Sequence, residues 1–210
     1  MKVTLKKIWS NRPCELSWNT LVDGLGMSGL KELNKDEKAP NIEVSLRFIL
    51  ENNGWEDCKW AWKCVGGYER EFRLLAVAFA KPFKHLMKDP RSLHALKVSE
   101  RFANGLATVE ELIVATDAAY YAYETADADA DAADAADAAD AADAADAADD
   151  ADAADAADAA DAAHVAYVAS RSFRSAARVS YASSYYLRAA QIAEFKRLLD
   201  CVEAGETYNI

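Results

Sequence analysis

Residues 131–150 read DAADAADAADAADAADAADD, and aspartate recurs at every third position from Asp131 to Asp161. This repeat lies inside a longer segment, residues 108–204, that contains no glycine and no proline. The segment is rich in alanine, the residue with the highest helix propensity. The sequence therefore predicts an all-α protein in which a small helical bundle is followed by a long Ala/Asp-rich helical region.

The length of this region predicts that it folds back on itself. Its 97 residues would form a straight helix about 145 Å long. Long helices gain most of their stability from packing, so shorter antiparallel pieces are favoured over one free rod. We expect an antiparallel hairpin or a multi-helix layer, with a turn between residues 163 and 184, where serines cluster. The pattern leaves the exact place of the turn open.

The spacing of the aspartates determines how their charge would be arranged on a helix. Three residues advance a helix by about 300°, so successive aspartates wind around the axis and return to the starting direction after about 18 residues. No face stays apolar, which disfavours a two-stranded coiled coil. Neighbouring aspartates repel each other, by a few tenths of a kcal/mol for each pair. Cations, a basic partner or the chain's own Arg171, Arg174, Arg178 and Arg188 are the candidates that could offset this repulsion.

Apolar residues at helical spacing also dominate residues 1–107. Helices are predicted with Pro13 in the first turn, over residues 69–89 and over residues 91–103, and Pro82 predicts a kink or break. The apolar positions expected to face inwards are Leu16, Trp18, Leu21 and Val22 in the first helix and Leu93, Leu96, Val98 and Phe102 in the last. A short helix is expected over residues 44–50, and strand signals are scarce.

Two signals mark the limits of the acidic region. Thr108 and Glu111 have the spacing of a capping box, so a helix is predicted to begin at Thr108. Residues 187–202 carry apolar residues at helical spacing and predict an amphipathic helix able to dock on the N-terminal bundle. The predicted parts are an N-terminal helical bundle (1–107), an acidic repeat region (108–163) and C-terminal helices that pack back (164–210).

The net charge of −11 resides in one part of the chain. Residues 117–162 contain 16 acidic residues and no lysine or arginine. Residues 1–116 have 18 basic and 15 acidic residues, and residues 163–210 have 6 basic and 4 acidic ones. A mildly basic body therefore carries one intensely acidic segment.

Catalytic and cofactor-binding patterns are missing from the sequence. The three histidines lack metal-binding spacing, and neither a nucleophile elbow nor a phosphate-binding loop occurs. Cys14, Cys58, Cys64 and Cys201 do not form a Cys-x-x-Cys motif, so free, partly buried thiols are expected. We predict a protein that is not an enzyme, with no cofactor and no dedicated metal site, whose aspartates attract divalent cations only diffusely.

The sequence also indicates where in the cell the protein resides. No stretch of about 18 apolar residues occurs, and the N-terminus MKVTLKKIWSNRP lacks the apolar core of a secretory signal. We expect a cytoplasmic protein that does not bind membranes. The oligomeric state is not indicated.

Residues 46–65 and 70–112 carry four short motifs in a fixed order. These are Asp57-x-x-Trp60-Ala61, Arg73-Leu74-x-Ala76, Asp89-x-Arg91-x-x-x-Ala95 and Gly105-x-Ala107-Thr108-x-x-Glu111-Leu112. With the alanine-rich region that follows, the chain over residues 43–190 resembles a family of immunity proteins of bacteria and phages. The resemblance implies a small helical protein that neutralises a target, and it transfers no catalytic residues to this chain. This chain has aspartate where the family mixes arginine, tryptophan, serine and aspartate, so no role of the repeat is carried over.

Two functions agree with these features. In the first, the protein is a non-enzymatic inhibitor of the immunity or phage counter-defence type, and its aspartates occupy a basic surface of a partner as a nucleic-acid mimic. In the second, tryptophan and tyrosine anchors on the helical body bind the partner, and the repeat is a solubilising spacer. A third interpretation gives the repeat no role and treats it as a tolerated expansion of a short coding unit.

The first function is preferred on charge density. One aspartate per three residues places a charge every ~4.5 Å along a helix, against ~3.4 Å along one DNA strand. The expected partner is a basic protein, such as a nuclease or another nucleic-acid-binding defence protein, and not nucleic acid itself. The predicted partner-binding residues are Asp127, Asp129, Asp131, Asp134, Asp137, Asp140, Asp143, Asp146, Asp149, Asp150, Asp152, Asp155, Asp158 and Asp161.

Overall fold

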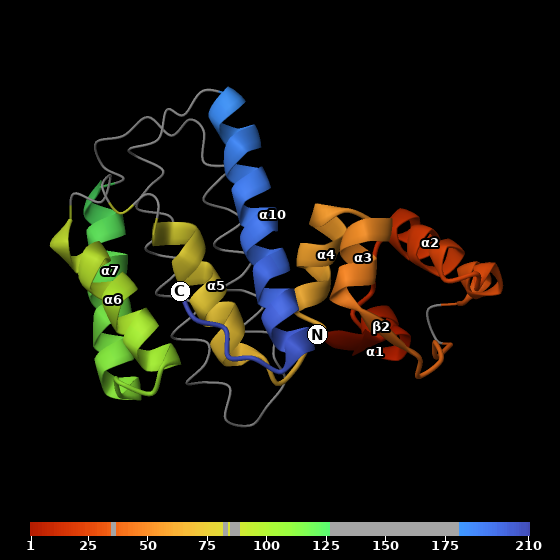
Figure 1. Ribbon diagram of the computed structural model, residues 1–210, viewed down its shortest axis with the longest axis horizontal. Coiled ribbons are helices and arrows are strands. Elements are labelled where there is room, and N and C mark those ends of the chain that lie inside the picture. The colour runs from red at the N-terminus through yellow and green to blue at the C-terminus, as the bar shows by residue number, and fades with distance from the viewer. Residues whose placement is uncertain (35–36, 82–83, 85–88, 127–180) are drawn as a thin grey trace. The chain divides into compact units, whose positions relative to one another are not determined.

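The computed structural model describes residues 1–34, 37–81, 84, 89–126 and 181–210. Helices dominate these residues (Figure 1), and the strands among them form one two-stranded sheet. The predicted all-α class is confirmed. The chain divides into two units, Met1–Gly66 and Gly67–Ile210.

The first unit contains two short strands, each of which leads straight into a helix. The strands are β1 (Lys2–Thr4) and β2 (Glu43–Ser45), and the helices that follow them are α1 (Leu5–Ser10) and α3 (Leu46–Asn52). The strands pair antiparallel, with Val3 opposite Val44, and both valines are buried. This pairing fixes the starts of two helices that are distant in the sequence.

A capping hydroxyl begins each of these helices. The side-chain oxygen of Thr4 accepts the backbone N–H of Lys7, and that of Ser45 accepts the backbone N–H of Phe48. The predicted helix start at Val44 is therefore wrong by two residues. Val44 lies in β2 because it pairs with a strand far away in the sequence, which helical spacing does not reveal.

The first unit also contains α2 (Glu15–Gly24), the 3-10 helix η1 (Ser28–Glu32) and α4 (Trp55–Trp62). The prediction that Pro13 lies in the first helical turn is wrong, because Cys14 is the N-cap and α2 begins at Glu15. Trp18, Leu21 and Val22 are buried as predicted. The indole N–H of Trp18 donates to the carbonyl oxygen of Leu30 at 2.9 Å. The prediction for Leu16 is wrong, because its side chain is 78% exposed. Two residues advance a helix by about 200°, so Leu16 lies on the opposite face from Trp18.

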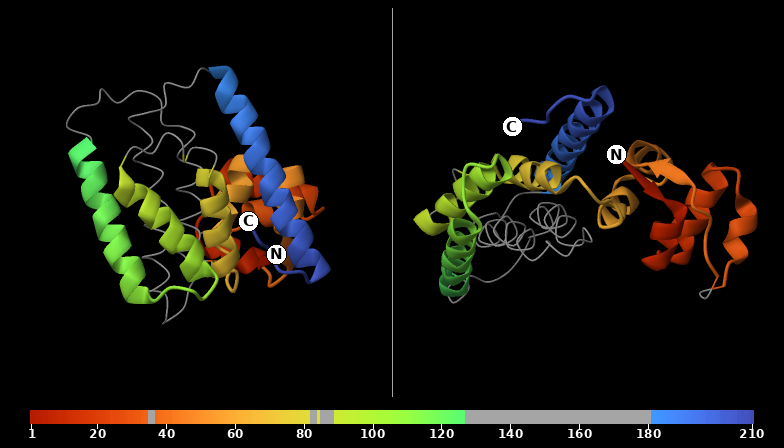
Figure 2. Two further views of the ribbon diagram at one scale, coloured as in Figure 1. Left: turned by 60° about the vertical axis from the view of Figure 1, so that its left-hand side comes forward. Right: turned by 90° about the horizontal axis from the view of Figure 1, so that it is seen from below.

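The described part of the second unit is a row of four helices. They are α5 (Glu69–Ala80), α6 (Pro90–Ala103), α7 (Val109–Ala126) and α10 (Tyr181–Ala204). Figure 2 shows them in the order α7, α6, α5, α10, and α6 packs against both α5 and α7 while α10 packs against α5. The predicted break at Pro82 is confirmed, since α5 ends at Ala80. Residues 187–202, predicted to dock on the N-terminal bundle (1–107), lie in α10, which contacts α5.

Small and branched side chains close the interface between α6 and α7. Its buried residues are Ala95 and Val98 from α6 and Leu112, Ala115 and Ala119 from α7. Alanine at three of these five places allows the two helices to approach closely. The alanine-rich start of the long segment is thus part of the core of this unit.

The capping box predicted at the start of α7 is confirmed. The backbone N–H of Glu111 donates to Thr108 Oγ1 at 3.2 Å, and the backbone N–H of Thr108 donates to Glu111 Oε2 at 3.2 Å. The predicted part boundary at residues 107/108 falls between α6 and α7, which pack against each other. The structural division of the chain lies at Gly66 and Gly67.

A C-terminal tail follows α10 and returns to α5 (Figure 1). Gly205 ends α10 with a φ of 71°, a left-handed conformation that favours glycine. Tyr208 is fully buried, and its hydroxyl donates to Glu194 Oε1 at 2.6 Å. Arg70 donates to the backbone carbonyl oxygen of Tyr208 at 3.0 Å. The guanidinium of Arg197 lies 4.6 Å from the centroid of the Tyr208 ring. The tail is therefore an integral part of the second unit.

Replacing Tyr208 with phenylalanine is expected to lower the free energy of unfolding of the second unit by about 1–2 kcal/mol. The phenol stays protonated because burial, and next its bond to Glu194, raise the pKa of Tyr208. Its loss removes a hydrogen bond to a charged acceptor. Tyr121→Phe is the matched control, since Tyr121 is 64% exposed. Thermal unfolding of both variants measures the effect, and equal melting temperatures would contradict the role of the hydroxyl.

Two sequence predictions lie largely outside the described residues. The hairpin and its turn were expected between residues 163 and 184, and of that window the structure describes only residues 181–184, which are helical. Among the helices that the structure describes, none is long and apolar enough to cross a membrane.

Candidate functional site

All predicted partner-binding aspartates, from Asp127 to Asp161, lie outside the described residues. The structure describes the helices on either side of them, with α7 ending at Ala126 and α10 beginning at Tyr181. Asp117, the first residue of the acidic segment, is exposed on α7. Of the four arginines considered as internal partners, only Arg188 is described, and it is exposed.

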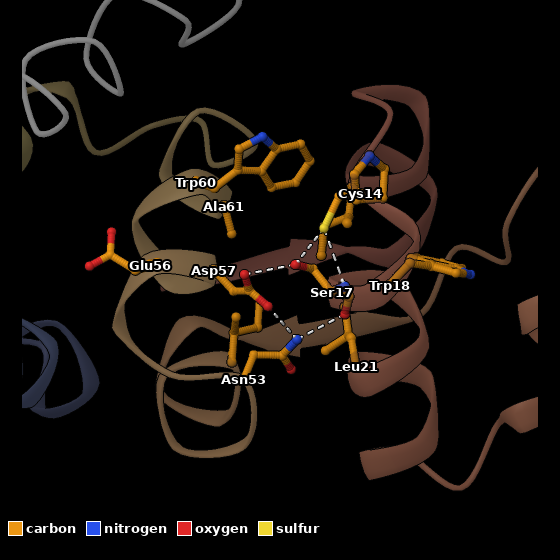
Figure 3. Close-up of a pocket in the computed structure, with 12 residues that line it drawn as sticks. Cys14, Ser17, Trp18, Leu21, Asn53, Glu56, Asp57, Trp60 and Ala61 are labelled. Carbon is orange, nitrogen blue, oxygen red and sulfur yellow. Dashed lines mark hydrogen bonds between the residues drawn. The ribbon is translucent and has the colours of Figure 1, made fainter.

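A second candidate site, not predicted from the sequence, is a pocket of about 240 Å³ in the first unit. It lies between the start of α2 and α4, as Figure 3 shows. The apolar and aromatic part of its wall comes from Ile8, Pro13, Trp18, Leu21, Ile49, Trp60 and Ala61, and the polar part from Cys14, Ser17, Asn53, Glu56 and Asp57. The pocket therefore combines a thiol and the Asp57 carboxylate with an indole-rich wall, while the Glu56 carboxylate points away from it in Figure 3 and pairs with Lys59 at 3.1 Å.

Local sequence signals place the polar residues of this pocket. Cys14 is the N-cap of α2, and its sulfur accepts the backbone N–H of Ser17 at 3.4 Å. Gly54 joins α3 to α4 with a φ of 94°, which favours glycine. This turn allows Asn53 before it and Asp57 after it to face the same neighbour, Ser17 of α2 (Figure 3).

A chain of hydrogen bonds connects these side chains. The hydroxyl of Ser17 donates to Asp57 Oδ1 at 2.8 Å and lies 2.9 Å from the sulfur of Cys14. The amide of Asn53 donates to Asp57 Oδ2 at 2.9 Å and to the carbonyl oxygen of Ser17 at 2.9 Å. Asp57 therefore fixes the distance between α2 and α4 and, through Ser17, orients the thiol.

The environment of Cys14 differs from that of the other cysteines. Hydrogen bonds with Ser17, first through its side chain and then through its backbone, lower the pKa of the exposed Cys14 thiol. Burial raises the pKa of Cys58 to about 12. Cys64 is also buried, Cys201 is partly buried, and none of the four takes part in a disulfide. Cys14 thus combines exposure with a lowered pKa, the two features of a reactive thiol.

Most tryptophans are not available as anchors for a partner. Trp18 and Trp62 are fully buried, and Trp55 is 7% exposed. Trp60 is partly exposed in the wall of the pocket, and the ammonium of Lys63 lies 4.6 Å from its ring centroid. Trp9, also partly exposed, donates its indole N–H to the carbonyl oxygen of Glu37.

The described residues contain no group of three or more histidine, cysteine, aspartate or glutamate side chains that could hold a metal ion. Comparisons of the chain with family models, curated proteins and solved structures find no match. The resemblance to immunity proteins therefore stays a prediction.

Proposed function

We propose that this protein acts by binding, as a non-enzymatic inhibitor whose Asp-Ala-Ala repeat occupies a basic, nucleic-acid-binding surface of a partner protein. The observation that carries this proposal is the segregation of charge, with 16 acidic and no basic residues in residues 117–162. An immunity or phage counter-defence role would use such a mimic against a nuclease or a related defence protein.

Charge density supports the mimicry. On a helix, the repeat would present one charge every ~4.5 Å, close to the ~3.4 Å spacing of a single DNA strand. A basic groove that has evolved for phosphates would release its bound anions on taking up such a segment. The salt dependence of nucleic-acid binding would then be reproduced by a protein.

The described body has its own ion pairs. Lys31 pairs with Asp23 and Lys81 with Glu100, the latter at 3.0 Å. Three arginines also form ion pairs: Arg91 with Asp89 at 2.8 Å, Arg101 with Glu111 at 3.3 Å, and Arg197 with Glu194 at 2.5 Å. These five basic side chains have acidic partners without any contribution from the repeat.

A second candidate function is partner binding through the body, and one feature of α7 favours it. Val114 is 68% exposed, Tyr121 is 64% exposed and Ile113 is 39% exposed. Val114 and Tyr121 are seven residues apart and so lie on the same face of the helix. An apolar helix face of this kind is suited to an aromatic-anchored contact. In that case the repeat acts as a spacer that keeps the body soluble.

Capture of partners from the native host tests the proposed function. Full-length protein is immobilised, and bound proteins are identified by mass spectrometry before and after a wash with single-stranded DNA. We expect a basic nucleic-acid-binding protein that the DNA wash releases, because both ligands would use one surface. A captured partner that DNA does not release would contradict mimicry and favour the α7 face.

A further inference from the structure

Asp57 is a partly buried carboxylate whose hydrogen-bond partners are both neutral. Its oxygens accept from the Ser17 hydroxyl and the Asn53 amide. Across the part of the chain that the structure describes, no lysine or arginine forms an ion pair with it. Carboxylate oxygens have two acceptor sites each, so both oxygens can accept a further hydrogen bond. The lining residues include no lysine or arginine, and of their two carboxylates Glu56 is paired with Lys59 at 3.1 Å, so Asp57 is the one that faces the pocket without a basic partner.

The wall beside this carboxylate suits a cation. Trp60 follows Asp57 on α4, and Figure 3 shows its indole on the side of the pocket near Cys14. The Lys63 ammonium lies over this ring, 4.6 Å from its centroid, and so occupies one of its faces. An aromatic ring has two faces, and a planar cation can stack on one of them.

The volume limits what can enter. A cavity of about 150 Å³ accepts benzene, whereas pockets for drug-sized ligands usually measure about 300–1,000 Å³. The pocket of about 240 Å³ lies between these sizes. It is therefore suited to one large side chain of another protein.

We infer that this pocket receives an arginine side chain of a basic partner protein. Arginine is planar, stacks on indole rings and donates two parallel hydrogen bonds to a carboxylate, and its aliphatic stem suits an apolar wall. Such a contact goes beyond the proposed role of the repeat, because it adds a second, geometrically specific point of attachment. The pocket and the repeat are separate in the sequence, so either can bind if the other does not.

The test uses the full-length protein and two probes of the same shape. Nα-acetyl-arginine amide carries the guanidinium, and Nα-acetyl-citrulline amide is its neutral isostere. Binding is followed by NMR through the indole N–H resonance of Trp60, assigned with the Trp60→Leu variant. We expect saturable binding of the arginine probe with a dissociation constant on the order of 1 mM. The citrulline probe should bind about tenfold more weakly or not at all.

Two variants locate the site. Asp57→Asn should lower the affinity for the arginine probe by about tenfold. Asp117→Asn removes an exposed aspartate of α7 and should leave this affinity unchanged. Trp60→Leu leaves the Ser17–Asp57–Asn53 hydrogen bonds intact and should also weaken binding, measured through the Ser17 amide resonance. Equal affinity for the two probes in the wild-type protein, or the lack of any saturable shift, would overturn the inference without reference to a variant. If the arginine probe does not bind, the proposed role of the repeat still stands, because the capture experiment tests it separately.

Discussion

Replacing the fourteen aspartates from Asp127 to Asp161 with asparagine is expected to weaken partner binding by about 10³-fold or more at 50 mM salt. The amide has nearly the shape of the carboxylate but no charge. If the repeat mimics a nucleic acid, its affinity derives mainly from the release of counterions. Six to ten such contacts change the affinity by about 10³–10⁵ between 50 and 200 mM salt.

The measurement is the dissociation constant for the captured partner over this range of salt. The wild-type protein should lose affinity steeply as salt rises, and the asparagine variant should bind weakly with little response to salt. Replacement of the same residues with glutamate is the control, because it keeps the charge and has a higher helix propensity than aspartate. Equal binding and an equal salt response of the wild-type and asparagine forms would assign the contact to the body.

The features of the fold that could be predicted depend on contacts between residues close in the sequence. Thr108 and Glu111 are three residues apart, and their reciprocal hydrogen bonds depend only on the local backbone. The end of α5 before Pro82 is likewise local, because proline cannot continue the backbone bonding of a helix. The all-α class follows from many such signals acting together.

The features that escaped prediction depend on residues far apart in the sequence. Val44 has helical neighbours after it, but its conformation is decided by Val3 on the opposite strand. A strand of three residues is too short to show the alternation by which strands are recognised. Leu16 is apolar like its neighbours, and only the packing of α2 shows which face is buried. The all-α class survives these errors because the two strands are only three residues long each and the exposed Leu16 still lies within α2.

The pocket illustrates the same limit for function. Cys14 and Ser17 have the spacing of an N-cap and its partner, but cysteine is not one of the usual N-cap residues, so the sequence does not indicate this cap. Their connection to Asp57 crosses from α2 to α4, and it is this contact that makes a site. The repeat, in contrast, was predicted as a site from composition alone, since charge needs no tertiary contact to be counted.

Alkylation by iodoacetamide at pH 8 is expected to modify Cys14 at least about 10²-fold faster than Cys58. The thiolate is the reactive form, so reactivity follows the pKa and the exposure of each thiol. Cys58 is fully buried with its pKa raised to about 12, so roughly one molecule in 10⁴ carries the thiolate at this pH. Peptide mapping by mass spectrometry over time gives the rate for each of the four cysteines.

The pH dependence of this reaction tests the cause assigned to the reactivity of Cys14. Hydrogen bonds with Ser17, first through its side chain and then through its backbone, lower the pKa of Cys14, so its rate should reach half of its plateau below pH 9, the usual value for a free thiol. Ser17→Ala removes the strongest of these bonds and should move the midpoint to higher pH, while the plateau rate stays similar. In denaturant the four cysteines should react alike, because exposure and hydrogen bonding are then equal. Two results would show that the N-cap position of α2 does not activate the Cys14 thiol. One is an alkylation rate of Cys14 with the same pH midpoint in Ser17→Ala as in the wild-type protein. The other is faster alkylation of the partly buried Cys201 than of Cys14.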